Sequence, residues 1–553
     1  MTAHDSDSPA PQRLPTKVDV LIVGLGPVGA TLANLLAQQS VNTLIIDKAD
    51  DILMAPRAIG LDNEAQRILQ MAGLADDAFE KLAIRECRLL SPWFGEFARF
   101  ATTGVIDGYA PLITFYQPDL ERALRHRLAT CDTVQMATGM ELVSFTDGGE
   151  SVTATLRLRD GSTTEVEARY LIGADGASSM VRRAIGQEFS GHSYGEDWLI
   201  IDTRNSTRSM QHIEFHCHRD GARPHIPAPG SRERWEFMLG PEQTAEQTPE
   251  QILSDVEVSR LLAPWGDSKS LEIERRAIYR FHARCCENFR KGNVFLVGDA
   301  AHITPPFAGQ GLVSGLRDAA NLAWKLAFVL QGRVGSTVLD SYDVERRPHA
   351  KAMIDLARFV GSVIMPNNRA KAFVIHALFR GLRLFGPIRR YFDELKVKPA
   401  PAFREGLFAT GKERLRRGAW IPQVLLRTPN GDTILSDEAL GDRVTLVGFG
   451  TDPRVHLDAA TLAKWEAIGG GIVEIASRSQ AVDRSADAYE DLTGELVPGT
   501  APPGWAAIIR PDRTILHDGP VADSARLIAE SCTLLGATKP SSTTDSVISK
   551  EAV

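Results

Sequence analysis

Two stretches of the chain place a short apolar run before a glycine-rich turn and a helical pattern. The first begins with the apolar residues 18–23 and continues into the turn at residues 24–29. A helical pattern then extends to about Gln39, and a second apolar run at residues 43–46 ends at Asp47. Short apolar runs rich in branched residues are typical of buried strands. The pattern therefore predicts a strand, a tight turn, a helix and a second strand that ends in a carboxylate.

The second stretch repeats this order of features. Residues 294–297 are all apolar and lead directly into Gly298-Asp299, which predicts a strand with a carboxylate at its carboxyl end. A proline pair at residues 305–306 excludes a helix at that point. Glycines on either side of Gln310 would let the backbone approach a ligand. A long helix with one apolar face is predicted from residue 312 to 330.

Elsewhere the hydrophobic positions alternate in short, strand-like pieces. Residues 134–168 predict a β-meander with turns near residues 147–149 and 160–161. The next strand ends at Asp175-Gly176, again a carboxylate and a glycine. Further strands are predicted at residues 198–202, 212–218 and 234–239, with a Pro/Gly-rich loop between the last two and a few helices packed on the sheet.

Two helices are also predicted in the first third of the chain. One covers residues 63–71 with Asp62 as its N-cap, and the other covers about residues 119–128 after Gln117-Pro118. Residues 370–392 mix apolar residues with arginines and predict a pair of basic amphipathic helices. A membrane-surface role for that pair is the less favoured alternative.

After residue 392 the composition changes. A linker with lysines and prolines is predicted at residues 396–401. Strand-like runs at residues 443–449, 471–475 and 505–509 then alternate with helical segments, which predicts a small α/β domain. A chain of 553 residues is long enough for two or three domains.

Composition narrows the class of protein. The formal net charge of -8 argues against a general nucleic-acid binder. Six cysteines form neither a CxxC pair nor a His/Cys cluster, so no disulfide framework or metal site is indicated, and reduced thiols in the cytoplasm fit best. The polar first 17 residues lack the apolar core of a signal peptide. We expect no membrane span, because no apolar run is long enough.

The first glycine turn has the spacing of a dinucleotide-binding motif. GxGxxG lies between a predicted strand and helix, with an acidic residue about 20 positions on, which is the required context. Gly24 and Gly26 would let the turn approach a pyrophosphate, and Gly29 would let helix and strand pack. Asp47 would accept hydrogen bonds from a ribose. The alternative is a glycine-rich turn required only for packing.

The second turn suggests a site for an anion. Free N–H groups at the start of the helix near Gly311 would favour a negative group, such as a reduced flavin ring. The carboxylate of Asp299 could bind hydroxyl groups of a polyol chain. The alternative is a strand-to-helix corner with an aspartate cap.

Taken in order, Gly24-x-Gly26-x-x-Gly29, Asp175-Gly176 and Gly298-Asp299 resemble the signatures of the class A flavoprotein aromatic hydroxylases, which are single-component FAD monooxygenases. The resemblance covers roughly residues 18–347 and is most specific in GDAAHxxPPxxGQG at residues 298–311. Within the class, the chain looks most similar to the hydroxylases of 3-(3-hydroxyphenyl)propionate. Segments that carry this closer similarity are PRAIGLDNEA at residues 56–65, RERWEFML at residues 232–239 and residues 342–356.

This resemblance implies an α/β fold with three domains. A Rossmann-like FAD-binding domain would be discontinuous over residues 18–186 and 276–395, and a mixed-sheet substrate-binding domain would be interleaved at residues 187–275. Residues 402–538 resemble the thioredoxin-like domain of phenol hydroxylase relatives, although they contain no CxxC. Residues 1–17 and 539–553 are expected to be a disordered lead and tail.

The resemblance also implies the cofactors and their site. FAD would be bound tightly and non-covalently, and NADH or NADPH would bind only transiently, because no second GxGxxG is present. The glycine turn would hold the pyrophosphate, and Asp299 would bind the ribityl or phosphate end. The implied cofactor-binding residues are Gly24, Gly26, Pro27, Val28, Gly29, Asp47, Lys48, Arg57, Gln117, Asp175, Gly176, Gly298, Asp299, Pro306, Gly309, Gly311 and Leu312.

In such enzymes O2 adds to reduced FAD to give a C4a-hydroperoxide, which hydroxylates a phenol ortho to its hydroxyl group. The expected substrates are 3-(3-hydroxyphenyl)propionate and 3-hydroxycinnamate in aromatic catabolism. One alternative is a larger aromatic, such as a polyketide or antibiotic, on the same scaffold. Another is a non-catalytic FAD-binding protein or a plain dehydrogenase. A homodimer is one option for the assembly.

No side chain is identified outright as catalytic, because the flavin carries the chemistry. The candidates for a base that acts on the phenol are His216, His218 and His225. The candidates for pairing with a substrate carboxylate are Arg219, Arg223 and Arg234.

Overall fold

The computed structural model describes residues 14–208, 210–218, 221–266, 271–365, 368–386, 398–412, 414–478 and 487–536. The chain divides into two compact units, one made of Met1–Ala323 with Arg346–Ala400 and the other of Trp324–Glu345 with Pro401–Val553. The predicted lead and tail fall almost entirely outside the described residues and stay predictions.

The first unit contains a mixed sheet with the strand order β17-β18-β11-β1-β2-β8, to which β10 and β9 are added beside β11. Its strands are β1 (Lys17–Val23), β2 (Thr43–Asp47), β8 (Val134–Thr138), β9 (Glu141–Asp147), β10 (Val152–Arg157), β11 (Thr163–Gly173), β17 (Arg290–Lys291) and β18 (Val294–Leu296). β1 is parallel to β2 and β11, and β11 is parallel to β18. β8 is parallel to β2 as well, so the carboxyl ends of five strands meet at one edge, which brings together the turns predicted to bind the cofactor.

The helices of this unit include α1 (Pro27–Gln38), α2 (Asn63–Met71), α3 (Gln117–Leu128), α4 (Met180–Ala184), α9 (Ser341–Ile364) and α10 (Arg369–Leu382), and α8 (Gly311–Leu330) begins in it. The helices predicted near residues 27–39, 63–71, 119–128 and 312–330 are confirmed. The predicted N-cap is confirmed too, because the Asp62 side chain accepts a hydrogen bond from the N–H of Ala65 at 2.9 Å. A three-stranded sheet has the order β3 (Gly60–Asp62), β7 (Leu112–Phe115), β4 (Lys81–Ala83), and β3 leads directly into α2.

A second large sheet in the same unit has the order β19-β16-β12-β15-β14-β13-β5-β6. Its strands are β5 (Glu86–Ser91), β6 (Gly95–Ala101), β12 (Phe189–Arg204), β13 (His212–His218), β14 (Gly221–Ala228), β15 (Arg232–Met238), β16 (Glu272–Cys286) and β19 (His302–Ile303). The sheet thus draws strands from both sides of residues 187–275, and the boundaries of a separate substrate-binding domain stay a prediction.

The Pro/Gly-rich loop predicted between residues 218 and 234 is wrong, because β14 occupies most of it and pairs with both β13 and β15. Its prolines argued against a strand, but Ala222, Ile226 and Ala228 are buried. Burial of these alternate residues on one face outweighs the ladder hydrogen bonds that proline cannot donate.

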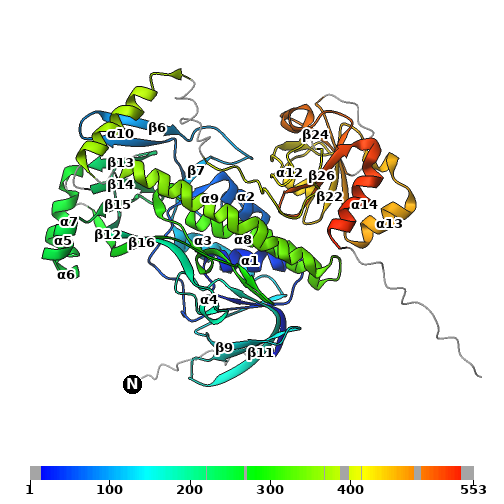
Figure 1. The fold of residues 1–553 in the computed structure, drawn as a ribbon, viewed down its shortest axis with the longest axis horizontal. Helices are drawn as coiled ribbons and strands as arrows, with labels where there is room; N and C mark the ends of the chain where they lie inside the picture. Colours follow the sequence, from blue (N-terminus) through cyan, green and yellow to red (C-terminus); the bar gives the residue numbers. More distant parts are fainter. Residues whose placement is uncertain are drawn as a thin grey trace, which may run out of the picture. The chain divides into compact units, whose positions relative to one another are not determined.

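This second sheet has two distinct faces. On the outer face, Trp235 and Phe237 pack against apolar residues of α6 (Pro249–Ile252) and α7 (Asp255–Leu262), and α5 (Pro241–Glu246) lies on the same side (Figure 1). On the inner face, Trp198, Ile200 and Met238 belong to a cluster that includes Phe307 and residues of α9. Residues two apart on a strand share a face. The even-numbered residues of β15 therefore lie on the inner face and the odd-numbered residues on the outer face.

The second unit contains a seven-stranded sheet with the order β21-β20-β24-β23-β22-β25-β26. Its strands are β20 (Leu425–Arg427), β21 (Thr433–Leu435), β22 (Thr445–Phe449), β23 (Gly471–Ala476), β24 (Ala488–Asp491), β25 (Trp505–Ile509) and β26 (Ile515–Pro520), and its helices include α12 (Ser436–Leu440), α13 (Ala459–Ala467) and α14 (Ser524–Leu534). The predicted small α/β domain is thus confirmed. Among the described helices, none is long and apolar enough to cross a membrane.

Candidate active site

The glycine turn between β1 and α1 is shaped by two close backbone approaches. Gly24 has a φ of +112°, and a Cβ there would lie 2.3 Å from the carbonyl oxygen of Ala174. A Cβ on Gly29 would lie 2.0 Å from the carbonyl oxygen of Gly24. A Cβ on Gly26 would meet nothing within 4 Å, and Gly26 gives α1 no side-chain cap. The space beside Gly26 at the start of α1 is therefore open, which fits a phosphate group there.

Asp47 at the end of β2 is held beside this turn. One carboxylate oxygen accepts a hydrogen bond from the N–H of Leu25 at 2.8 Å, and the other accepts from the N–H of Ala49 at 2.8 Å. Each oxygen keeps a second lone pair, so the carboxylate can still accept hydrogen bonds from ribose hydroxyls. Lys48 next to it is exposed.

Gln117 at the start of α3 fixes the segment that contains Arg57. Its side-chain oxygen accepts hydrogen bonds from the N–H groups of Arg57 at 2.9 Å and Ala58 at 2.8 Å, while its amide donates to Glu121 at 2.8 Å. Gln117 therefore positions this backbone and leaves the Arg57 side chain exposed.

Asp175 and Gly176 lie at the next strand end along the same edge. One oxygen of Asp175 accepts hydrogen bonds from the N–H groups of Met180 at 2.7 Å and Val181 at 3.2 Å, which caps α4. The other oxygen is buried without a hydrogen-bond partner among the described residues. Arg182 links this segment to the Gly298 turn, because it donates to the carbonyl of Ala300 at 3.1 Å.

Asp299 follows β18, and its side chain is half-buried. No described residue donates a hydrogen bond to its carboxylate. Burial raises the pKa of Asp299, although the positive charges of His302 and Arg57 oppose this rise. Val28 of α1 lies against this turn, because a Cβ on Gly298 would be 3.1 Å from its side chain. The three predicted turns thus converge, and an acceptor without a partner here fits a polyol hydroxyl.

Below this turn, Asp318 of α8 holds three groups. One of its oxygens accepts hydrogen bonds from the N–H of Gly298 at 2.9 Å and contacts the His302 ring at 2.7 Å. The other accepts from the Arg346 guanidinium at 2.8 Å. The side chains of Asp318, His302 and Arg346 are all buried. Burial would raise the pKa of Asp318, but His302 and Arg346 outweigh it and lower that pKa.

The segment before α8 leaves several groups open. Pro306 and Gly309 are exposed, Gly311 and Leu312 are half-buried, and Gly309 has a φ of +63°. Phe307 beside them is buried in the inner-face cluster. This segment therefore joins the strand-end turns to the inner face of the second sheet.

A buried polar network that the sequence analysis missed supports the start of α8. Arg317 donates to Glu64 at 2.7 Å, to Gln310 at 3.0 Å and to Asp62 at 3.2 Å, and Lys398 donates to Asp62 at 2.7 Å. Burial would raise the pKa of Asp62, but Lys398 and Arg317 lower it far below its ordinary value. The residues come from segments more than 200 positions apart, so no local pattern could have revealed the network.

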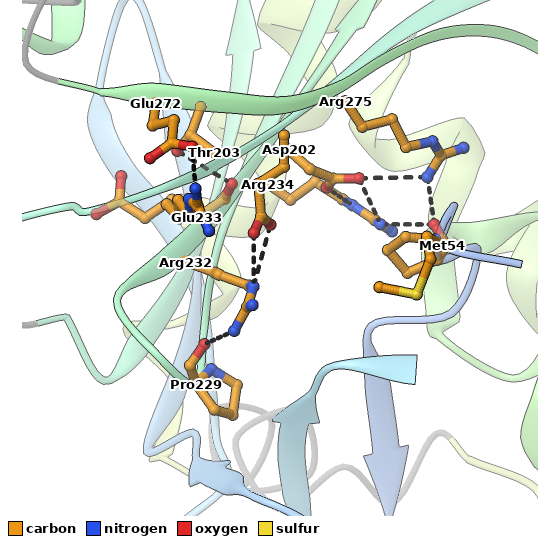
Figure 2. Close-up of polar contacts among 12 residues, drawn as sticks. Met54, Asp202, Thr203, Pro229, Arg232, Glu233, Arg234, Glu272 and Arg275 are labelled. Atoms are coloured by element: carbon orange, nitrogen blue, oxygen red, sulfur yellow. Dashed lines mark hydrogen bonds and ion pairs between the residues drawn. The ribbon is translucent and has the colours of Figure 1, made fainter. Parts of the chain in front are cut away.

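A second missed cluster lies on the inner face of the second sheet. Asp202 of β12 accepts hydrogen bonds from Arg234 of β15 at 2.6 and 3.1 Å and from Arg275 of β16 at 3.2 Å (Figure 2). Arg234 also donates to the carbonyls of Pro56 at 2.9 Å and Arg57 at 2.8 Å, and Arg275 donates to that of Pro56. The two guanidinium groups thus tie the Arg57 segment to the sheet.

Arg234 was predicted as a partner for a substrate carboxylate, but most of its N–H groups are engaged by these contacts. Next to the cluster, Glu236 is 8 % exposed. Sequence parity could have found this pair, since Arg234 and Glu236 alternate with Trp235 and Phe237 in a strand that is buried on both faces.

The other predicted catalytic residues lie on the opposite, outer face. His225 stacks on Trp235 with ring centroids 4.7 Å apart and contacts Glu233 at 3.0 Å. His216 packs edge-on against Trp265, and Arg223 lies over Phe237. These three candidates stay predictions without geometric support. Arg219 and the side chain of His218 lie outside the described residues.

Residues 17–357 match the family model described as FAD binding domain, and residues 418–533 match the HcaD C-terminal domain. The chain belongs to this family of FAD-binding flavoproteins and is a flavoprotein aromatic monooxygenase that uses FAD with NADH or NADPH as co-substrate. The features above fit that cofactor, because the strand-end turns offer free N–H groups and unsatisfied carboxylate oxygens at one edge.

Two relatives match this chain over most of its length. The chain is 36% identical over 510 residues to the 3-(3-hydroxy-phenyl)propionate/3-hydroxycinnamic acid hydroxylase of Klebsiella pneumoniae (strain 342), covering 90% of this chain and 91% of the relative. It is 35% identical over 531 residues to the protein of the same name from Burkholderia cenocepacia (strain HI2424), covering 93% and 96%. Among solved structures, the flavin-dependent monooxygenase PieE in complex with FAD and substrate has a TM-score of 0.78 at 21% identity, covering 94% of this chain and 99% of that one. That similarity shows the fold alone.

Proposed function

We propose that this enzyme hydroxylates 3-(3-hydroxyphenyl)propionate and 3-hydroxycinnamate to their 2,3-dihydroxy products, with NADH or NADPH and O2 as co-substrates. The supporting observation is the 35–36% identity, over at least nine-tenths of the chain, to hydroxylases named for these substrates. Similarity that extends over both units favours the same reaction more strongly than a shared FAD-binding domain alone would.

We infer that the cofactor lies along the edge where the five parallel strands end. Gly24, Gly26 and Gly29 would hold its pyrophosphate with Pro27 and Val28 at the start of α1, and Asp47 with Lys48 would lie at the adenosine ribose. Asp299 and Gly298 would contact the ribityl or phosphate portion. The remaining proposed contacts are Arg57, Gln117, Asp175, Gly176, Pro306, Gly309, Gly311 and Leu312.

FAD, when bound and reduced, supplies the activated oxygen atom for the reaction. The chain itself would orient the phenol and exclude water on the inner face of the second sheet. Trp198, Phe307 and Met238 supply an apolar surface there, and a dry surface limits loss of the activated oxygen to water. Arg234 and Arg275 would hold the Arg57 segment in place beside the cofactor.

The proposal also covers the co-substrate O2, the oligomeric state and the location of the enzyme. O2 is proposed to react with the reduced cofactor, to be checked by oxygen uptake during turnover. A homodimer is proposed, to be checked by light scattering of the purified enzyme. A cytoplasmic location is proposed, to be checked by cell fractionation.

Turnover of matched substrates tests the function. The purified enzyme should be yellow, and 3-(3-hydroxyphenyl)propionate should accelerate NADH or NADPH oxidation with equal consumption of O2 and formation of the catechol. 3-Phenylpropionate, which lacks the hydroxyl group, is the control and should give no product. A flavin-containing enzyme that no small phenol stimulates would overturn the proposal and favour a larger aromatic substrate.

A further inference from the structure

Glu236 is a buried carboxylate that the fold does not satisfy. It is 8 % exposed, and no described residue donates a hydrogen bond to it or forms an ion pair with it. The other buried acids of this sheet differ, because Asp202 is held by two arginines and Glu233 by His225 and Ser206. An unsatisfied buried carboxylate is costly, so its presence requires an explanation.

The position of Glu236 on β15 places it on the inner face. It pairs with Ile200 of β12, which belongs to the inner-face cluster with Phe307. On its own strand it lies between Arg234, which binds the carbonyls of Pro56 and Arg57, and Met238, which packs against that cluster. Glu236 therefore lies between the Arg57 segment and the Phe307 segment, both of which flank the proposed cofactor site.

The charged groups that act on Glu236 come from three adjacent strands. They are Arg234 on β15, Asp202 on β12 and Arg275 on β16, and Arg275 also donates a hydrogen bond to the hydroxyl of Tyr279. Burial raises the pKa of Glu236 to about 7, Arg234 and Arg275 oppose that rise, and Asp202 adds to it. An acid that titrates near neutral pH is suited to accept and return a proton.

We propose that Glu236 is the base that accepts the hydroxyl proton of the phenol during hydroxylation, an inference that rests on the proposed function. The O–H bond of the phenol breaks, its proton moves to a carboxylate oxygen of Glu236, and its electron pair enriches the ring. As the proton moves, one oxygen atom of O2 bonds to the ortho carbon and the O–O bond breaks, and the second oxygen atom leaves as water with the hydride of NADH or NADPH and one proton from solvent. That carbon loses its hydrogen as a proton, which passes to the new oxygen, and Glu236 returns its proton to the original one. The product is a neutral catechol, and the two electrons come from NADH or NADPH.

A phenol ordinarily ionises near a pKa of about 10, well above that of Glu236. Full transfer before attack is therefore unfavourable, and we expect the proton to move as the ring is attacked. The positive charges of Arg234 and Arg275 would favour the negative charge that develops on the phenol oxygen.

Two substitutions at Glu236 and one control on the same strand test the inference. Glu236→Gln keeps the shape but cannot accept the proton, and Glu236→Asp keeps the carboxylate. Glu233→Gln is the matched control, because Glu233 is also buried but lies on the outer face. Catechol formation and NAD(P)H oxidation with 3-(3-hydroxyphenyl)propionate would be measured from pH 5.5 to 9 for each FAD-loaded protein.

We expect wild-type kcat for catechol formation to rise with pH through about 7 and then level off. Glu236→Gln should lower it by roughly 10²–10⁴-fold, abolish the rise and change KM little, and Glu236→Asp should restore part of the rate with a shifted profile. The Glu233→Gln profile should follow the wild type.

The outcomes separate the two proposals. Wild-type turnover together with an unchanged profile in Glu236→Gln would overturn the role of Glu236 alone, whereas a wild type that no phenol stimulates would overturn the proposed function and this inference with it. If Glu236→Gln does not fold, the wild-type profile and the Glu236→Asp variant decide. The inference would be refuted if the wild-type kcat did not change with pH. It would also be refuted if the pH profile of Glu236→Asp were the same as that of the wild type.

Discussion

Replacing Glu236 by glutamine should stabilise the protein at neutral pH, because the fold holds this carboxylate where its charged form is disfavoured. The ordinary pKa of 4.5 rises to about 7 in the folded protein. At about 1.36 kcal/mol per pKa unit, this difference corresponds to about 3 kcal/mol. The folded protein therefore binds more protons than the unfolded chain between pH 4.5 and 7, and its stability falls as the pH rises through that window.

The glutamine side chain cannot ionise, so this loss should be absent from Glu236→Gln. We expect the variant to gain about 3 kcal/mol of unfolding free energy relative to the wild type between pH 4.5 and 8, and the gain should be complete above pH 7. Urea denaturation with saturating FAD, followed by tryptophan fluorescence at several pH values, measures this difference. Comparing two proteins that differ at one residue removes the contributions of all other titrating groups.

Glu233→Gln provides a control of opposite sign. Burial would raise the pKa of Glu233, but the hydrogen bonds from His225 and Ser206 outweigh it and lower that pKa. Its stabilising contribution is present above its ordinary pKa of 4.5 and is lost as the pH falls through its lowered pKa, so Glu233→Gln should destabilise the protein at neutral pH. If the stability difference for Glu236→Gln did not change between pH 4.5 and 8, the reasoning about burial would be refuted.

Three further predictions follow from the strand-end turns. Gly24→Ala should destabilise the protein even without FAD, because its Cβ would lie 2.3 Å from the Ala174 carbonyl oxygen. Gly26→Ala should leave the apoprotein stable, since its Cβ meets no atom within 4 Å, but it should weaken FAD binding because the Cβ would occupy space proposed for the pyrophosphate. Thermal denaturation and FAD titration distinguish the two, and equal stability losses in the apoproteins would contradict this. Asp299→Ala should weaken FAD binding by roughly 10-fold or more, as expected when a hydrogen-bond acceptor for a buried hydroxyl is removed, and titration of the apoprotein by flavin fluorescence checks it; unchanged affinity would exclude the contact. Asp318→Asn should lower the unfolding free energy by about 3–5 kcal/mol, because it leaves the buried Arg346 without its charged partner, and a loss below 1 kcal/mol in urea denaturation would be inconsistent with that account.

Much of the cofactor edge could be predicted because its signals are local. Each turn lies next to its own strand in the sequence, and the parallel register of β1, β2, β11 and β18 then brings Asp47, Asp175 and Asp299 to one edge. Glycine spacing records a backbone requirement, as at Gly24 with its φ of +112°. Such a requirement can be recognised without knowledge of distant contacts.

The substrate side was predicted less well because its determinants are not local. Histidine content drew attention to His216 and His225, but strand parity places both on the outer face with Trp265. Which face of a strand points to the cofactor depends on the neighbouring strands and on the Phe307 segment, which are far away in the sequence. The prolines of β14 likewise obscured a strand whose burial decides its conformation.

The hydrogen bonds from Arg234 and Arg275 to the backbone at Pro56 and Arg57 have a thermodynamic consequence. Both side chains hold the carbonyls of Pro56 or Arg57, so one short piece of backbone is shared by the region that receives the dinucleotide and the sheet that faces the aromatic compound. Any ligand that orders this piece removes part of the entropic penalty for the other ligand. We therefore expect each ligand to raise the affinity of the other by the same factor, as linkage requires. The aromatic substrate should thus increase the affinity of the apoprotein for FAD even when no turnover takes place.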